Sequence, residues 1–174
     1  MTSVSTADKT KPYLPLAGAS QDGWSNGQRA TATCFCGAVQ LSFPTSGPGL
    51  VDTFLCNCTD CRKITASMFA SNFTIDDEYL THERGRDNLS KYSQSKSIGT
   101  DNTMTNYFCS TCGSLMYRIG TGFPGKSILR LGTVDDFNLS ETQLKPRIEQ
   151  FVKDRVAWLH GADGVEQVQG YAYA

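Results

Sequence analysis

From Ala30 onward the chain consists of short runs in which apolar and polar residues alternate. The clearest run covers residues 38–43 and ends at Pro44. A period of two predicts half-buried β-strands, because successive side chains of a strand point to opposite faces of its sheet. Similar runs predict further strands over residues 51–55, 68–75, 89–92, 103–108, 115–119, 128–131 and 150–152.

Turn-forming residues separate these runs, and helical periodicity is limited to single turns such as residues 60–64. Glycine and proline recur between the predicted strands, at Gly85, Gly99, Gly120, Gly122, Pro124 and Gly125. Many short strands joined by turns are typical of antiparallel sheets. The sequence therefore predicts a mostly β fold made of antiparallel sheets.

The length of the chain, 174 residues, is enough to bury one substantial core, so a single folded domain is expected. Residues 1–29 show no hydrophobic period and are predicted to form an extended N-terminal arm. The folded domain is predicted over residues 30–160, and residues 161–174 are predicted to form a C-terminal tail.

Composition and charge argue against nucleic acids and membranes as partners. The chain is 39% hydrophobic and 19% charged, as globular proteins are, and its formal net charge is −1. Basic residues are interspersed with acidic ones, so no nucleic-acid partner is expected. No apolar run reaches the ~20 residues that cross a bilayer, and the polar N-terminus lacks the apolar stretch of a secretory signal. We expect a cytoplasmic protein without a membrane contact; the sequence does not identify protein partners.

All seven cysteines fall into three short clusters. In a reducing compartment, clustered cysteines indicate metal ligands more readily than disulfides. Zinc takes four thiolate or imidazole ligands, held by short loops in a tetrahedron. Two of the clusters end in a cysteine followed by glycine, which permits a tight turn around the sulfur. This shared feature favours one closed four-thiolate zinc site, whose ligands are Cys34, Cys36, Cys109 and Cys112.

The third cluster, Cys56, Cys58 and Cys61, is then left as a separate set of three ligands. Three protein ligands and an open fourth position are typical of a catalytic zinc. Three thiolates make the metal electron-rich and a weak Lewis acid. Such a metal is suited to binding and deprotonating an incoming thiol. Arg62 adjoins this cluster and is expected to contact an anionic substrate.

Other readings of the same cysteines remain open at this point. Cys58 and Cys61 could join Cys109 and Cys112 in a zinc ribbon, or could form a redox pair by themselves. Alternatively, the cluster of three could be a second structural site, closed by a carboxylate or by one of the two histidines, His82 and His160.

Three motifs in this order resemble the glutathione-dependent formaldehyde-activating (GFA) enzymes, a family that includes the centromere protein V group. The motifs are Cys34-Phe35-Cys36-Gly37-Ala38-Val39, Cys56-Asn57-Cys58-Thr59-Asp60-Cys61-Arg62-Lys63 and Phe108-Cys109-Ser110-Thr111-Cys112-Gly113-Ser114. Weaker similarity continues through residues 131–136 and 145–158. The resemblance covers residues 31–159, so residues 30–160 are interpreted as a GFA-type zinc-binding domain.

The resemblance implies an Mss4-like fold, with antiparallel β-sheets built around a structural zinc site. It implies two zinc ions per chain, a structural one on the four paired cysteines and a catalytic one on Cys56, Cys58 and Cys61. The implied activity joins glutathione and formaldehyde to S-hydroxymethylglutathione, or breaks that carbon–sulfur bond. With glutathione as substrate or co-substrate, Arg62 and Ser67 are expected to contact glutathione or another substrate.

The sequence departs from the family pattern beside the predicted catalytic site. Asn57 stands where the family often has histidine, and Glu149-Gln150 stands where it often has His-Ile. Ile64-Thr65-Ala66 also stands before Ser67, where the family usually has a Ser-Gly or Gly-Gly step before the serine. These departures leave the metal ligands intact but bear on the substrate.

Three functions follow from these observations. The first is a zinc-dependent carbon–sulfur lyase or synthase that acts on glutathione adducts. The second is the same kind of zinc enzyme with another small aldehyde or thioether as substrate. The third is a non-enzymatic Mss4-like zinc module that binds a protein partner.

Overall fold

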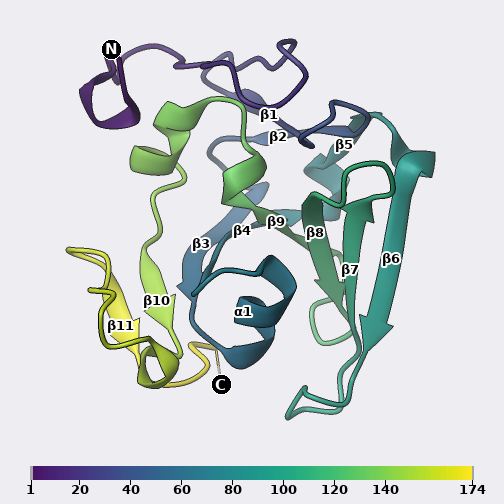
Figure 1. Cartoon of the computed structure of the whole chain (residues 1–174), viewed down its shortest axis with the longest axis vertical. Helices are drawn as coiled ribbons and strands as arrows, with labels where there is room; N and C mark the ends of the chain where they lie inside the picture. Colours follow the sequence, from purple (N-terminus) through teal and green to yellow (C-terminus); the bar gives the residue numbers. More distant parts are fainter. Residues whose placement is uncertain (1, 174) are drawn as a thin grey trace.

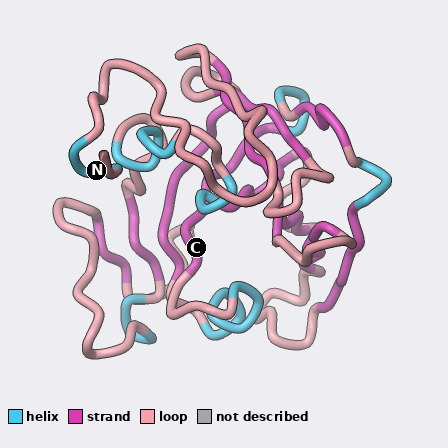
Figure 2. Tube along the Cα trace, turned by 45° about the horizontal axis from the view of Figure 1, so that its top comes forward, coloured by secondary structure: helices cyan, strands magenta, loops and turns pink. Residues whose placement is uncertain are grey.

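The structure is a computed structural model that describes residues 2–173. Figure 2 shows the strands, in magenta, running through the molecule with short helical segments between them. The strands are β1 (Arg29–Thr33), β2 (Gln40–Pro44), β3 (Leu50–Cys56), β4 (Ala70–Asp76), β5 (Thr81–Arg84), β6 (Leu89–Gln94), β7 (Met104–Cys109), β8 (Leu115–Gly120), β9 (Lys126–Arg130), β10 (Ile148–Gln150) and β11 (Glu166–Val168). The helical segments are η1 (Val4–Thr6), α1 (Thr59–Thr65), η2 (Asp77–Tyr79), η3 (Arg86–Asn88), η4 (Leu131–Thr133), η5 (Phe137–Glu141) and η6 (Val152–Asp154).

The larger sheet has eight strands in the order β11-β10-β3-β4-β9-β8-β7-β6. From β3 to β6 every neighbouring pair is antiparallel. The short strand β10 pairs in parallel with both β3 and β11. The predicted mostly β fold with antiparallel sheets is therefore confirmed, with parallel pairing confined to this edge.

The smaller sheet has three strands in the order β1-β2-β5 and packs against one face of the larger sheet. Phe43 of β2 and Phe73 of β4 are both fully buried, and their ring centroids lie 4.7 Å apart. Buried side chains from both sheets surround this pair: Ala30, Ala32, Val39, Leu41, Ile75, Met116, Tyr117 and Leu129. The main hydrophobic core lies between the two sheets.

Substitution of Phe43 by alanine should destabilise the protein strongly. Removal of a fully buried phenylalanine leaves a cavity that a rigid interface between sheets fills poorly, at a cost of about 3–5 kcal/mol. Urea unfolding of the Phe43→Ala variant would measure this loss as a lower midpoint. The exposed Phe35→Ala variant is the matched control, and an equal shift in both would contradict the assigned core.

Helix α1 lies against the other face of the larger sheet (Figure 1). Cys58 precedes the helix as its N-cap, and its sulfur accepts a hydrogen bond from the Cys61 backbone N–H at 3.4 Å. The helix ends where Ala66 adopts a left-handed conformation, with a φ angle of 52°. Cys61 is the buried residue of this helix, so the third cysteine of the cluster is pressed onto the sheet.

Three strands are absent from the predicted set, β1, β5 and β11. Thr81–Arg84 alternates exposed with half-buried positions and contains no aliphatic residue, so it carries little hydrophobic signal. Glu166–Val168 is mostly exposed and pairs along the outer edge of β10. It lies inside the segment predicted as a C-terminal tail.

The segment predicted as an N-terminal arm runs over η5. The Tyr13 backbone N–H donates to the Asp136 carboxylate at 2.9 Å, and the Tyr13 ring contacts the edge of Phe137. Leu14 and Leu16 are exposed, so Tyr13 rather than the leucines holds this segment. Within residues 2–173, no helix is long and apolar enough to cross a membrane.

Candidate metal centres and the cavity beside them

The first candidate centre joins two loops that are distant in sequence. Cys34 and Cys36 lie in the turn between β1 and β2, whereas Cys109 ends β7 and Cys112 follows in the turn before β8. The four sulfur atoms all lie within 4.8 Å of one another. The structure thus brings together the four cysteines that the glycine pattern paired.

Both turns depend on a glycine with positive φ. Gly37 has a φ angle of 81° and Gly113 one of 75°, a backbone region that other residues rarely adopt. Each glycine N–H donates to the carbonyl of the first cysteine of its cluster, at 2.9 Å and 2.8 Å respectively. These turns position the sulfurs where backbone N–H groups can donate to them. The Val39 N–H, for example, donates to the Cys34 sulfur at 3.2 Å.

The sulfur separations in this cluster fit a tetrahedral zinc ion. A Zn–S bond of about 2.3 Å places sulfurs about 3.8 Å apart. The Cys34 and Cys36 sulfurs are 3.6 Å apart, and the Cys36 and Cys109 sulfurs are 3.7 Å apart. The cluster could hold a metal ion, and its four sulfur donors are consistent with zinc.

Ionisation is uneven within the four-cysteine cluster. Burial raises the pKa of Cys34 to about 12. At Cys112 burial also opposes ionisation, but hydrogen bonds from Ser114 outweigh it and lower the pKa to about 6. The Cys112 thiol therefore ionises more readily than the Cys34 thiol. Metal binding must displace the remaining protons.

The second candidate centre is formed by three cysteines close in sequence. Cys56 ends β3, Cys58 caps α1 and Cys61 lies in its first turn. Their sulfurs all lie within 4.8 Å of one another, and among residues 2–173 no histidine or carboxylate atom joins them at that distance. The set offers three sulfur ligands on one side of a metal ion.

Within this three-cysteine cluster the proton distribution favours a thiolate at Cys61. Hydrogen bonds from Cys56 and Cys58 hold the pKa of Cys61 well below its usual range, with Arg130 and Arg118 adding to the effect against the cost of burial. The same thiol–thiolate contacts raise the pKa of Cys56. A divalent cation would take the place of the shared protons.

Neither histidine closes this cluster. His82 lies in β5 of the smaller sheet, where its Nε2 atom is 3.2 Å from the Tyr117 hydroxyl. His160 is exposed in the chain that follows η6. Cys109 and Cys112 are also occupied elsewhere, so the zinc-ribbon pairing with Cys58 and Cys61 is not formed.

Two arginines lie on the sheet face beneath Cys61. Leu129 and Tyr117 face the main core, so the alternation of a strand turns their neighbours Arg130 and Arg118 to the opposite face. Arg118 is 7% exposed and Arg130 is 5% exposed. The Arg118 Nη1 atom lies 3.8 Å from the Cys61 sulfur. Burial lowers the pKa of Arg130 to about 10, which still leaves its guanidinium charged at neutral pH.

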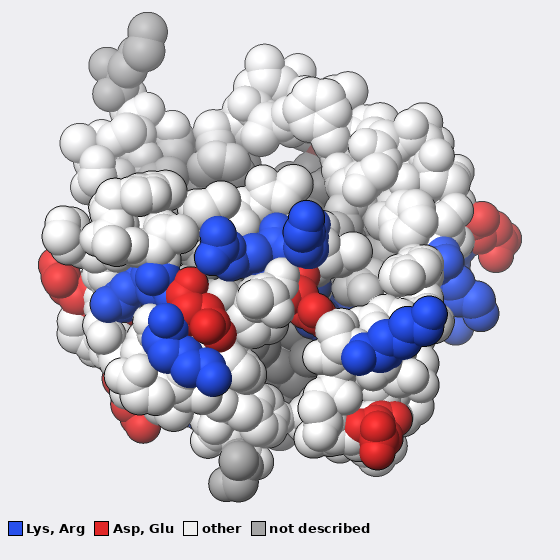
Figure 3. Space-filling model, turned by 60° about the horizontal axis from the view of Figure 1, so that its bottom comes forward, with Lys and Arg blue, Asp and Glu red and all other residues white. Residues whose placement is uncertain are grey.

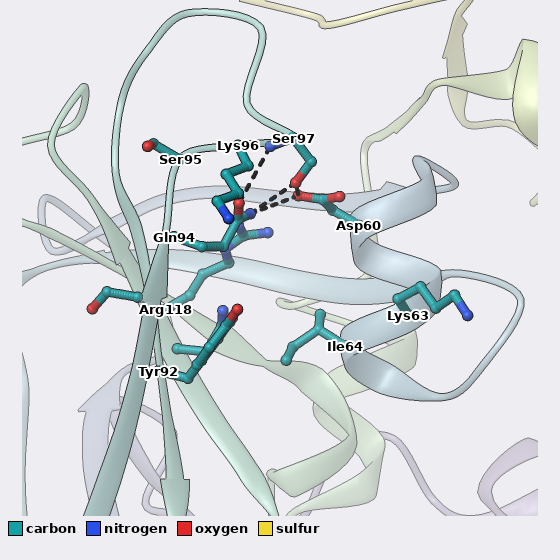
Figure 4. Close-up of a pocket in the computed structure, with 11 residues that line it drawn as sticks. Asp60, Lys63, Ile64, Tyr92, Gln94, Ser95, Lys96, Ser97 and Arg118 are labelled. Atoms are coloured by element: carbon teal, nitrogen blue, oxygen red, sulfur yellow. Dashed lines mark hydrogen bonds between the residues drawn. The ribbon is translucent and has the colours of Figure 1, made fainter.

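A cavity of about 570 Å³ opens above Arg118, between α1 and the strands β6, β7 and β8 (Figure 4). Figure 3 shows Lys, Arg, Asp and Glu side chains around a hollowed face of the molecule. The loop after β6 is tied to α1, because Gln94 Nε2 and the Ser97 hydroxyl both donate to the Asp60 carboxylate, at 3.2 Å and 2.7 Å. The remaining lining residues are Lys63, Ile64, Tyr92, Ser93, Ser95, Lys96 and Asn106.

The two residues expected to contact substrate lie away from this lining. Arg62 donates to the Asp154 carbonyl at 3.3 Å and contacts the Met68 sulfur. Ser67 is exposed in the bend that follows α1. Substrate contact by these two residues stays a prediction. The cavity is lined instead by residues that include Arg118, Asn106 and Tyr92. Arg118 could have been noticed in the sequence, because it is a charged residue within the apolar run of β8.

Two departures from the family pattern meet in space. Asn57, between two cysteines of the cluster, is fully buried, and its Nδ2 atom donates to the Glu149 carboxylate at 2.9 Å. The other carboxylate oxygen of Glu149 accepts from Arg155 at 3.0 Å. The two positions are 92 residues apart in sequence, so their pairing appears only in the fold.

Fold and cysteine clusters together define a mostly β protein with two candidate zinc centres, one with four sulfurs and one with three. A family model described as "Glutathione-dependent formaldehyde-activating enzyme" matches residues 29–154, and the chain belongs to that family.

Comparison with solved structures finds a crystal structure of a Rhodobacter sphaeroides protein at 26% identity, covering 59% of this chain and 85% of that one. Its TM-score is 0.44, which is too low to support a statement about the fold. The comparison with curated proteins found no match.

Proposed function

We propose that this protein is a zinc-dependent carbon–sulfur lyase or synthase that acts on glutathione adducts, with S-hydroxymethylglutathione as the reference product. The observation that carries the proposal is the three-cysteine cluster, which lies beside a cavity and lacks a fourth cysteine, histidine or carboxylate ligand among residues 2–173. Cys56, Cys58 and Cys61 would hold the catalytic zinc. The structural zinc would be held by Cys34, Cys36, Cys109 and Cys112.

Zinc bound by three thiolates would keep a thiol sulfur ionised at neutral pH. In the forward reaction the glutathione sulfur attacks the aldehyde carbon. A carbon–sulfur bond forms as the carbonyl π bond breaks, and the oxygen takes up a proton equivalent to the one that the thiol loses. The reverse reaction breaks the carbon–sulfur bond and returns both reactants, so no oxidant or reductant is needed.

The cavity fits a substrate of the size and charge of glutathione. Its volume of about 570 Å³ is typical of small-molecule sites. Lys63 and Lys96 of the cavity lining can pair with carboxylates (Figure 4), and Arg118, which also lines the cavity, lies 3.8 Å from the Cys61 sulfur. A peptide thiol could therefore place its sulfur near the cluster with its carboxylates towards the lysines.

The exchange rate between free and glutathione-bound formaldehyde tests this proposal. Exchange by nuclear magnetic resonance at equilibrium reports rates in both directions, and a sample without protein gives the spontaneous rate for comparison. We expect the exchange rate to rise in proportion to the concentration of protein that carries two zinc ions. A fully zinc-loaded protein that leaves the spontaneous rate unchanged would contradict the proposal for formaldehyde.

The Asn57–Glu149 pair favours a second candidate, the same reaction class with another small aldehyde or thioether. This pair replaces residues that the family often has beside the cluster, so it changes the polarity of the cluster's buried surroundings. The same exchange assay with larger aldehydes distinguishes the candidates by which aldehyde is accelerated most. A protein that accelerates none of them would instead fit a zinc module that binds a protein partner.

A further inference from the structure

Two buried guanidinium groups beside the three-cysteine cluster lack the acidic partners that such groups normally have. Arg118 and Arg130 form no ion pair with a carboxylate among residues 2–173. Buried Nε atoms of both residues, and Nη2 of Arg130, have no hydrogen-bond partner there either. These side chains do donate hydrogen bonds, Arg118 to the Cys61 sulfur and Arg130 to the side-chain amide oxygen of Asn72.

An unpaired buried cation is costly, so a pair of them requires nearby negative charge. The Cys61 sulfur, 3.8 Å from Arg118 Nη1, supplies some of it when it is ionised. With a divalent cation bound, three thiolates leave one net negative charge, whereas the two guanidiniums carry two positive charges. The site then holds one positive charge in excess, and one further monoanion would make it neutral.

We propose that Arg118, with Arg130 behind it, forms an anion-binding wall that holds the substrate sulfur as a thiolate beside the three-cysteine cluster. The proposal rests on the proposed function only for the identity of that anion. Arg118 lines the cavity (Figure 4) and also contacts the Cys61 sulfur, so it touches both the space for the substrate and the cluster. Arg130 does not line the cavity, and Asn72 fixes its position. It acts as the second charge.

The neighbours of the two arginines support an anion as the expected occupant. Asn106 and Lys96 line the cavity with Arg118. Asp60 is the acidic residue of this lining, and its carboxylate is already bound to Gln94 and Ser97. A negatively charged sulfur would therefore meet guanidinium N–H groups rather than a free carboxylate.

Thiol binding to the metal-loaded protein tests the wall without depending on turnover. Cobalt(II) replaces zinc, because sulfur-to-cobalt charge-transfer absorption reports each added thiolate. The probe is 2-mercaptoethanol, which carries no carboxylate, and its methyl thioether is the uncharged control. We expect Arg118→Met to weaken 2-mercaptoethanol binding by about 10- to 100-fold, since hydrogen bonds to charged groups contribute on that scale. Arg118→Lys should restore part of the loss.

Lys91→Met is the matched control, because Lys91 is an exposed cation on β6 outside the cavity lining. It should leave thiol binding unchanged. Two results would overturn the wall. If Arg118→Met weakens glutathione binding but not that of 2-mercaptoethanol, the residue binds a carboxylate. If it lowers cobalt content while the loaded protein binds thiol normally, the arginine only supports the cysteines.

These outcomes are separate from failure of the proposed function. If the protein binds 2-mercaptoethanol through Arg118 but accelerates no aldehyde exchange, the anion-binding wall is supported and the proposed enzymatic function is contradicted. If the Arg118→Met variant accelerates exchange as well as the wild-type protein and binds the thiol as tightly, the enzymatic function is supported and the anion-binding wall is contradicted.

Discussion

Replacing Cys58 with serine should lower the rate of the proposed reaction by about 100-fold or more and leave the fold intact. Even residues that only support a metal ligand change activity by about 10- to 100-fold, so loss of a ligand is expected to cost at least as much. Zinc content should fall from two ions per chain to one.

Position 58 makes this substitution informative. The Cys58 sulfur is the N-cap acceptor of α1, and serine is among the best N-cap residues. The variant therefore keeps the start of the helix and removes only the sulfur ligand. Circular dichroism, a metal count and the exchange assay measure the three parts of the expectation. Full activity with one zinc ion per chain would contradict a catalytic role for the cluster.

The same substitution at Cys112 should have the opposite outcome, with loss of the fold. Cys112 is half-buried as Cys58 is, so the two changes are matched in chemistry and in exposure. Its cluster ties the turn between β1 and β2 to the turn between β7 and β8, and thus joins the two sheets. Structural zinc contributes about 10–16 kcal/mol in small zinc domains, more than most domains have in reserve.

Thermal unfolding and the fraction of soluble protein measure the effect at Cys112. We expect this variant to be largely unfolded or insoluble under conditions where the Cys58→Ser variant melts near the wild-type temperature. If both variants unfold alike, the three-cysteine cluster is structural as well. If neither unfolds, the four-cysteine cluster does not hold the sheets together.

The grouping of the cysteines into sets of four and three was the part of the candidate site that the sequence indicated well. Cysteine clusters are local in sequence, and Gly37 and Gly113 mark turns that only glycine readily adopts. Most strands could be predicted for a similar reason. The alternation of apolar and polar residues is also local in sequence, and it indicates that one face of a strand is buried. The exposed strands β5 and β11 bury too little to leave such a signal.

The position of the two arginines beside Cys61 could not be predicted from the sequence, because it depends on the register in which the strands pair. Arg118 and Arg130 interrupt apolar strands, but only the pairing of β8, β9 and β4 places both beneath Cys61. Likewise, Asn57 and Glu149 were two separate departures from a family pattern until the fold joined them. Contacts between distant segments, not residue types, were the missing information.

The separation of the cysteines from their arginine neighbours also bears on the order of synthesis. Cys61 and Arg118 are 57 residues apart, and Arg130 follows later still. A chain leaves the ribosome N-terminus first. The three thiols are therefore synthesised before the two guanidiniums. The guanidiniums come to lie beside the cysteines only when β8 and β9 pair in the sheet, so the positive charge of this site is added after its sulfurs.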